Sequence, residues 1–234
     1  MGIAPIRPAF CLAERAPLRF ERRMTKVEKQ TPDYSFEAAA AAKGAMRIVG
    51  VDEVGRGPWA GPVVAAAVWL DPKHIPEGLN DSKKLTAKRR EGLLAAIHEH
   101  GDVCIASASV EEIDALNILR ASHLAMERAV QGLAIAPDHL LVDGNMIPKG
   151  LTGRGEAIIK GDGRSVSISA ASIVAKIWRD QLMVDLAQQH PGYGWETNAG
   201  YGTKTHQEGL AKFGVTPHHR RSFKPIHNIL YQDK

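Results

Sequence analysis

The sequence contains little cysteine, few aromatic residues and no long apolar segment. Its two cysteines, Cys11 and Cys104, lie far apart and form no C-x-x-C pair, so neither a disulfide scaffold nor a zinc site is expected. This cysteine content fits a reducing, cytoplasmic setting. The longest apolar run, residues 62–70, is far shorter than the roughly 20 residues of a membrane-spanning helix, so no membrane association is expected.

The chain also lacks a strong excess of charge of one sign once its first 45 residues are set apart. Residues 1–45 hold 8 basic and 5 acidic residues, which leaves 22 basic and 21 acidic residues in 46–234. The net charge of +4 is therefore a weak sign of nucleic-acid binding. From residue 200 onward, however, basic residues outnumber acidic ones. Acids gathered at one site would thus leave a basic rim for an anionic partner.

Two regions are expected. Residues 1–45 are predicted to be a disordered basic tail, because they hold four of the 13 prolines and show no sustained hydrophobic periodicity. A short helix around 36–43 is the one regular element considered there. Residues 46–234 are predicted to form a single folded domain.

Strand-like apolar runs alternate with helical patterns through the second region. Strands are expected at 47–52, 62–70, 102–109, 138–143 and 156–160. Helices are expected at 86–99, 111–116, 118–132, 167–189 and 204–213. This order predicts an α/β domain whose mixed sheet is flanked by helices.

Two neighbouring acids, Asp52 and Glu53, end the first apolar run and open into a Gly-Arg-Gly turn. Carboxylates are ligands that Mg²⁺ and Mn²⁺ prefer, and glycines let a backbone approach a ligand closely. Successive side chains of a regular strand point to opposite faces, so both acids are expected to reach one site only if the strand ends or bulges at Glu53. A dinucleotide-binding loop is disfavoured, because G-x-G-x-x-G is absent and a second apolar run follows instead of a helix.

Two further apolar runs each end in an acid, Asp143 in an Asp-Gly turn and Asp162 in Gly-Asp-Gly. Open α/β sheets place their sites at the carboxyl ends of strands, and four carboxylates suit a two-metal phosphoryl-transfer centre. Asp180 competes with Asp162 for the fourth position. Alternatively, Asp180 pairs with Lys176, which precedes it by one helical turn.

Seven segments, taken in order, resemble the signatures of the bacterial ribonuclease HII family. They are V-D-E-V-G-R-G-P-W-A-G-P-V-V-A-A-A-V, N-D-S-K-K-L-T, L-L-V-D-G-N, K-G-D, S-A-A-S-I-V-A-K-I-W-R-D, G-Y-G-T-K-T-H and H-R-R-S-F, and the resemblance covers roughly residues 47–223. The resemblance implies a ribonuclease H-like fold with a five-stranded mixed sheet. It also implies endonucleolytic cleavage of RNA in RNA–DNA hybrids, including single ribonucleotides embedded in DNA, and hence a role in ribonucleotide excision repair.

The same resemblance assigns roles to individual residues. The catalytic, metal-binding acids it implies are Asp52, Glu53, Asp143 and Asp162. The residues that read the 2′-hydroxyl at the RNA–DNA junction are Gly55, Arg56 and Gly57, and the aromatic residue at the junction is Tyr201. Charge alone suggests further contacts to phosphates, namely Lys83, Lys84, Lys176, Lys204, Arg220 and Arg221.

The sequence thus predicts a monomeric endoribonuclease that uses two Mn²⁺ or Mg²⁺ ions and leaves 3′-hydroxyl and 5′-phosphate ends. Selectivity is expected to come from the 2′-hydroxyl, the group that distinguishes RNA from DNA. The rival hypothesis is a catalytically inactive nucleic-acid-binding module on the same fold. Acids present at all four positions favour the enzyme.

Overall fold

A computed structural model of the protein describes residue 1 and residues 31–231. Its centre is one five-stranded sheet in the order β3-β2-β1-β4-β5. The strands are β1 (Ile48–Val54), β2 (Val63–Leu70), β3 (Gly101–Ala108), β4 (His139–Asp143) and β5 (Gly155–Ile158). β2 is antiparallel to both β1 and β3, whereas β4 is parallel to β1 and β5. The mixed sheet expected from the sequence is confirmed.

Eight α-helices surround or extend this sheet in the described residues. They are α1 (Ser35–Ala41), α2 (Ala87–His100), α3 (Val110–Leu116), α4 (Ile118–Gln131), α5 (Val166–Gln189), α6 (Trp195–Asn198), α7 (Lys204–Phe213) and α8 (Lys224–Tyr231). Three short 3-10 turns carry loop residues, η1 (Ser82–Lys84), η2 (Lys149–Leu151) and η3 (Gly161–Gly163). The sequence pattern located α2, α3, α4, α5 and α7 within one or two residues, and it missed α6 and α8. None of the helices in the described part of the chain is long and apolar enough to cross a membrane.

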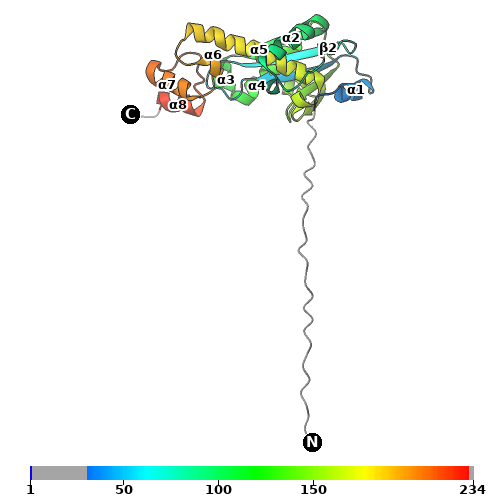
Figure 1. Ribbon diagram of the computed structural model, residues 1–234, viewed down its shortest axis with the longest axis horizontal. Coiled ribbons are helices and arrows are strands. Elements are labelled where there is room, and N and C mark those ends of the chain that lie inside the picture. The colour runs from blue at the N-terminus through cyan, green and yellow to red at the C-terminus, as the bar shows by residue number, and fades with distance from the viewer. Residues whose placement is uncertain (2–30, 232–234) are drawn as a thin grey trace.

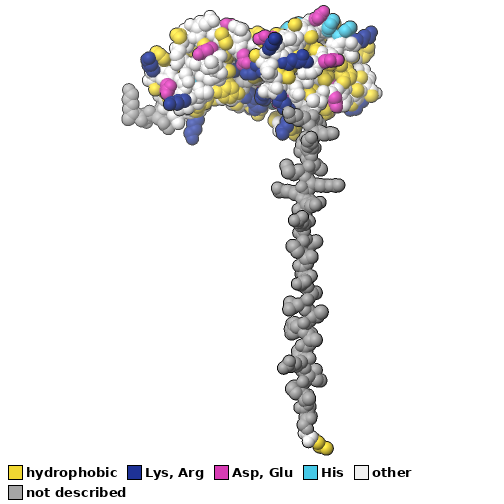
Figure 2. Space-filling model, viewed as in Figure 1, with side chains coloured by type: hydrophobic (Ala, Val, Ile, Leu, Met, Phe, Trp, Pro, Cys, Tyr) yellow, Lys and Arg dark blue, Asp and Glu magenta, His cyan; other side chains and the backbone are white. Residues whose placement is uncertain are grey.

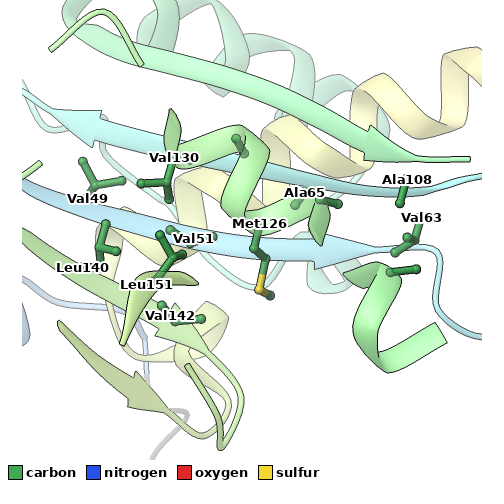
Figure 3. Close-up of a cluster of buried hydrophobic side chains, with 14 of the residues drawn as sticks. Val49, Val51, Val63, Ala65, Ala108, Met126, Val130, Leu140, Val142 and Leu151 are labelled. Carbon is green, nitrogen blue, oxygen red and sulfur yellow. The ribbon is translucent and has the colours of Figure 1, made fainter. Parts of the chain in front are cut away.

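Two apolar layers cover the two faces of the sheet. Alternate residues of β1, Val49 and Val51, pack on α4 together with Leu140 and Val142 of β4, as Figure 3 shows. The opposite face packs on α2 and on the first half of α5. The period of two in the strands therefore divides the side chains between two cores.

α5 lies unusually close to β1, and Gly50 is the reason. A Cβ atom at Gly50 would lie 2.1 Å from the carbonyl carbon of Ser167 and 2.3 Å from the nitrogen of Ile168. Only hydrogen fits at that position. The close approach brings the next residue of β1 on the same face, Asp52, beside α5.

The second half of α5 extends beyond the sheet and organises a smaller core. Its Met183 and Leu186 pack with Trp195 of α6, Leu210 of α7 and Ile226 of α8. In Figure 1, α6, α7 and α8 lie at one end of the molecule and α1 lies toward the other. This smaller core holds the chain segment that contains Tyr201.

Residues 31–45 fold onto the body, although the sequence assigned them to the tail. α1 matches the short helix considered around 36–43, and its Glu37 is buried. Oε1 of Glu37 accepts hydrogen bonds from Ser165 Oγ at 2.6 Å and from the backbone N–H of Ser167 at 3.0 Å. The remainder of the predicted tail, 2–30, lies outside the described residues.

Acidic and basic side chains share the surface of the body. On the face drawn in Figure 2, Lys and Arg are interspersed with Asp and Glu. This agrees with the nearly neutral charge of residues 46–234.

We predict that Gly50→Ala destabilises the protein by about 2 kcal/mol or more, because an added methyl group would overlap the backbone of α5. Thermal or chemical unfolding measures this effect. The matched control is Gly92→Ala on α2, where an added Cβ meets no atom within 4 Å. That variant should gain up to about 1 kcal/mol, since glycine is unfavourable inside a helix. Equal stability of the two variants would contradict the close packing of β1 on α5.

Candidate active site

Three carboxylates meet where β1 and β4 end. One oxygen atom from each of Asp52, Glu53 and Asp143 lies within 4.8 Å of the other two. Asp52 is only 5% exposed. The structure therefore brings together the acids that the sequence placed at the carboxyl ends of two strands.

The strand does not end or bulge at Glu53, so that expectation was wrong. β1 stays paired with β2 as far as Val54, but its pairing with β4 stops at Val51 opposite Val142. Beyond that point Asp52 faces α5 and lines the same cavity as Ser172 of that helix. The side chain of Glu53 projects from the opposite face of the sheet and, together with Asp143, lines a small cavity beside α4. The three carboxylates converge at the point where the pairing of β1 with β4 ends.

Each carboxylate of this cluster disfavours the ionisation of its neighbours. Burial raises the pKa of Asp52 well above its usual range, and the negative charges of Glu53 and Asp143 raise it further. Burial likewise raises the pKa of Asp143, against a hydrogen bond of 2.6 Å from the N–H of Gly161. Protein groups neutralise this cluster only in part, as expected of a site that holds cations.

The cluster also has an unused ligand atom. Oε1 of Glu53 accepts a hydrogen bond of 3.1 Å from Arg56, but its Oε2 is buried and has no hydrogen-bond partner. A buried carboxylate oxygen without a partner is costly unless a cation binds it. The residues present therefore fit a divalent metal ion.

Asp162 lines the same cavity as these three acids, and Asp180 does not. Asp162 lies on η3, and the N–H of Gly161 in the same turn donates a hydrogen bond to Asp143. Burial raises the pKa of Asp162, and the charges of Asp81 and Asp143 raise it further. Asp180 instead pairs with Lys176 at 2.7 Å and does not line the cavity that contains Asp162. The geometry favours Asp162 as the fourth acid.

The four acids open into a cavity of about 430 Å³ that also contains most of the predicted substrate-binding residues. Its other lining residues are Val54, Gly55, Arg56, Gly57, Ser82, Lys83, Ser172, Lys176 and Tyr201. Tyr201 is 49% exposed, and a Cβ at Gly57 would lie 3.2 Å from Cε1 of its ring. The glycine-rich turn and the tyrosine, 144 positions apart, thus face each other.

Two of the predicted lysines lie elsewhere. Lys84 does not line the cavity and lies 4.0 Å from Asp81, whereas Lys204 is largely exposed and lies 3.7 Å from Glu208. Lys83 does line it. Burial disfavours the charged form of Lys83, but Asp81 and the acids of the site outweigh that effect and raise its pKa.

Two arginines behind the cavity are buried, Arg220, whose role the sequence analysis misassigned, and Arg179, which it missed. Arg220, expected to contact phosphate, is fully buried and donates to the carbonyls of Gly55 at 2.6 Å, Arg56 at 3.0 Å and Gly61 at 2.9 Å. That expectation was wrong. Burial lowers the pKa of Arg220 to about 9, so it remains a cation at neutral pH.

Arg179 plays a similar part from α5. It donates to the carbonyls of Ala60, Pro62 and Ala199 at 3.0 to 3.2 Å. Burial lowers its pKa to about 10. The sequence signalled only a polar position on a helix, because nothing local shows that these carbonyls surround it.

Similarity to known proteins agrees with this site. The family model described as ribonuclease HII matches residues 49–226. The chain belongs to the ribonuclease HII family. It is 70% identical to the ribonuclease HII of Ruegeria pomeroyi over 224 residues, which cover 96% of this chain and 94% of that protein.

Solved structures of related proteins share the fold. The crystal structure of ribonuclease H2 from Pyrococcus horikoshii OT3 is 30% identical and covers 80% of this chain and 98% of its own, with a TM-score of 0.67. Bst-RNase HIII in complex with Mn²⁺ is 21% identical and covers 84% of this chain and 73% of its own, with a TM-score of 0.62, which shows the fold alone. The ribonuclease H-like fold is confirmed.

Family membership establishes the class of activity. The protein is a ribonuclease H, an endonuclease and hydrolase that acts on RNA in hybrids with DNA. Enzymes of this family use divalent metal ions, and the carboxylate cluster supplies a matching set of ligands. The rival hypothesis of an inactive binding module is not supported.

Asp52→Asn should stabilise the metal-free protein, because it removes a buried charge from beside two others. We expect a gain on the order of 1 kcal/mol, or about 2–4 °C in Tm. The raised pKa of Asp52 sets the pH dependence. As pH falls through that pKa, wild-type Asp52 becomes neutral and gains stability, so the advantage of the variant should shrink.

Thermal melts in chelator across the acidic range measure this, with Asp185→Asn on the far part of α5 as the control. Added Mn²⁺ should stabilise the wild type and have little effect on Asp52→Asn. A variant less stable than the wild type at neutral pH would contradict the repulsion inferred for the cluster.

Proposed function

We propose that this ribonuclease H cleaves the RNA strand of hybrids and also cuts duplex DNA at single embedded ribonucleotides. The observation that carries the proposal is the single cavity in which the carboxylates, the glycine-rich turn at 55–57 and the ring of Tyr201 meet. Such a cavity would place the scissile phosphate, the ribose after it and the next deoxyribose within reach of different residues.

The four acids would hold two divalent cations, Mg²⁺ or Mn²⁺. Asp52, which has a ligand atom within 4.8 Å of those of Glu53 and Asp143, would be shared by the two ions, and Asp162 would complete the set. When bound, such ions lower the pKa of an attacking water and stabilise charge on the leaving 3′-oxygen. The expected products are a 3′-hydroxyl and a 5′-phosphate.

The protein's own groups orient these ligands and the substrate. Oγ of Ser172 lies 2.9 Å from Oγ of Ser82, and both serines line the cavity with Asp52, so η1 and α5 are held together beside this carboxylate. Lys83 and Lys176 line the cavity as cations for flanking phosphates.

Selectivity would come from the two sides of the cavity. Arg220 donates to the carbonyls of Gly55 and Arg56 and so holds their peptide planes in place. This backbone would lie beside the scissile phosphate and contact the 2′-hydroxyl. The ring of Tyr201 would pack on the deoxyribose that follows, where an added 2′-hydroxyl would crowd it. The monomeric state and the cytoplasmic location expected from the sequence, with a role in ribonucleotide excision repair, stay predictions.

Cleavage of an end-labelled duplex that contains one ribonucleotide tests the proposal. With Mg²⁺ or Mn²⁺, the wild type should nick it on the 5′ side of the ribonucleotide and leave a 3′-hydroxyl that a DNA polymerase can extend. Asp162→Asn should lose activity by roughly a thousandfold or more, because it removes a charge from the metal site. Asp180→Asn should retain most of its activity, because that carboxylate pairs with Lys176. The reverse ranking would exclude Asp162 as the fourth acid.

Tyr201→Ala should lower the rate on a single embedded ribonucleotide by roughly tenfold or more, because a stacked aromatic ring contributes about 1–3 kcal/mol. Its rate on an all-RNA strand paired with DNA should fall less. Metal binding should stay unchanged, since none of the carboxylates is altered. Tyr231→Ala on α8, also an exposed tyrosine, is the control. An unchanged rate on the single ribonucleotide would remove Tyr201 from junction recognition.

A further inference from the structure

Two histidines that are not part of the carboxylate site are completely buried behind Tyr201. His206 of α7 and His219 are both 0% exposed. They lie in the smaller core beside Trp195, with 3.0 Å between their Nε2 atoms. Buried polar rings of this kind need a consistent set of donors and acceptors.

Backbone geometry determines which nitrogen of each ring carries a proton. The N–H of Thr216 donates to Nδ1 of His219 at 2.9 Å, so this nitrogen is an acceptor. A neutral His219 therefore carries its proton on Nε2 and donates it to Nε2 of His206. Because Trp195 Nε1–H also donates to that atom at 3.1 Å, Nε2 of His206 is an acceptor as well.

The remaining proton of His206 is thus on Nδ1, and it points to Tyr201. Nδ1 of His206 lies 2.9 Å from the carbonyl oxygen of Tyr201. The hydrogen bonds run in one direction from Thr216 through both imidazoles to this carbonyl. Protonation of either ring would place two donors against each other.

Both rings are neutral at ordinary pH. Burial lowers the pKa of His206, and burial with the neighbouring His206 lowers the pKa of His219 to about 3. The other titratable groups near His219 are His218 and His190, and both lower its pKa further. The direction of the hydrogen bonds is therefore stable throughout the neutral range.

Tyr201 needs such a support because of its neighbours. It lies between Gly200, whose φ is +84°, and Gly202, and its side chain is half exposed. Its N–H donates to the carbonyl of Asn198 at 2.9 Å, and its own carbonyl, the second point at which the peptide is fixed, accepts from the N–H of Thr203 at 2.8 Å as well as from His206. A glycine on each side would otherwise allow the ring to move relative to Gly57.

We propose that His206 is a positioning residue for junction recognition. Its Nδ1–H, oriented by His219 and Trp195, holds the Tyr201 backbone so that the Tyr201 ring packs on the deoxyribose that follows the ribonucleotide. This inference rests on the proposed role of Tyr201. It predicts that the direction of one buried hydrogen bond affects selectivity between substrates without changing the metal site.

Two substitutions of His206 separate positioning from simple packing. The amide of asparagine reaches the place of Nδ1 and can still donate to the Tyr201 carbonyl, whereas the amide of glutamine reaches the place of Nε2 and cannot. Both remove a buried ring and cost comparable stability. His206→Gln should lower the rate on a single embedded ribonucleotide by roughly tenfold, and His206→Asn should restore most of it. Rates on an all-RNA strand should fall by less than threefold in both.

Nuclear magnetic resonance of ¹⁵N-labelled wild-type protein tests the hydrogen-bond chain without any substrate. The ring nitrogens should report His206 protonated on Nδ1 and His219 protonated on Nε2 at neutral pH. The opposite tautomers would overturn the proposal even if neither variant folds. Equal losses for the two variants on both duplexes would also overturn it, because they would show a purely structural role.

A wrong role for Tyr201 and a wrong role for His206 would give different results in these assays. If Tyr201→Ala leaves the rate on a single ribonucleotide unchanged while the tautomers are as expected, junction recognition by Tyr201 is wrong and the selectivity role of His206 falls with it. If Tyr201→Ala impairs that substrate but His206→Gln does not, the proposed function stands and the positioning role is wrong.

Discussion

Repulsion between carboxylates is the constraint around which this molecule is built. Three acids approach within 4.8 Å of one another, and burial makes their charges more costly still. Only a scaffold that is stable without them can hold them together. The β1–β4 pair and the contact of Gly50 with α5 supply that scaffold, since neither depends on the acids themselves.

The side of the cavity that faces the substrate is held by a different kind of interaction. Arg179 and Arg220 donate to backbone carbonyls on segments that are distant in sequence, the turn after β1 and the loop before α7. Buried guanidinium groups bound only to carbonyls keep their positive charge near an anionic substrate. The turn at 55–57 is therefore held in place by tertiary hydrogen bonds, although its glycine content alone suggests flexibility.

α5 connects these two parts. Its first half packs on the sheet and contributes Ser172 and Lys176 to the cavity, while its second half carries Arg179 and the smaller core that positions Tyr201. The buried Glu37 of α1 binds the start of the same helix, close to η3 and Asp162. The segment 31–45 thus packs on the body, through contacts that composition alone does not reveal. Two buried hydrogen bonds to Glu37 and the packing of Phe36, Ala40 and Ala45 hold this segment on the body.

The sequence by itself determined the alternation of strands and helices, the acids at the strand ends and the seven family segments, because these depend on local periodicity and on residue order. Tertiary structure decided which charged residues face the site. Asp162 and Asp180 are both acids near helical segments, yet only Asp162 lies on a turn bonded to Asp143. Arg220 and Lys204 are both basic residues in the last 35 positions, but one is buried against carbonyls and the other is solvent-exposed. Burial is a property of the packed chain, so no local pattern distinguishes these pairs.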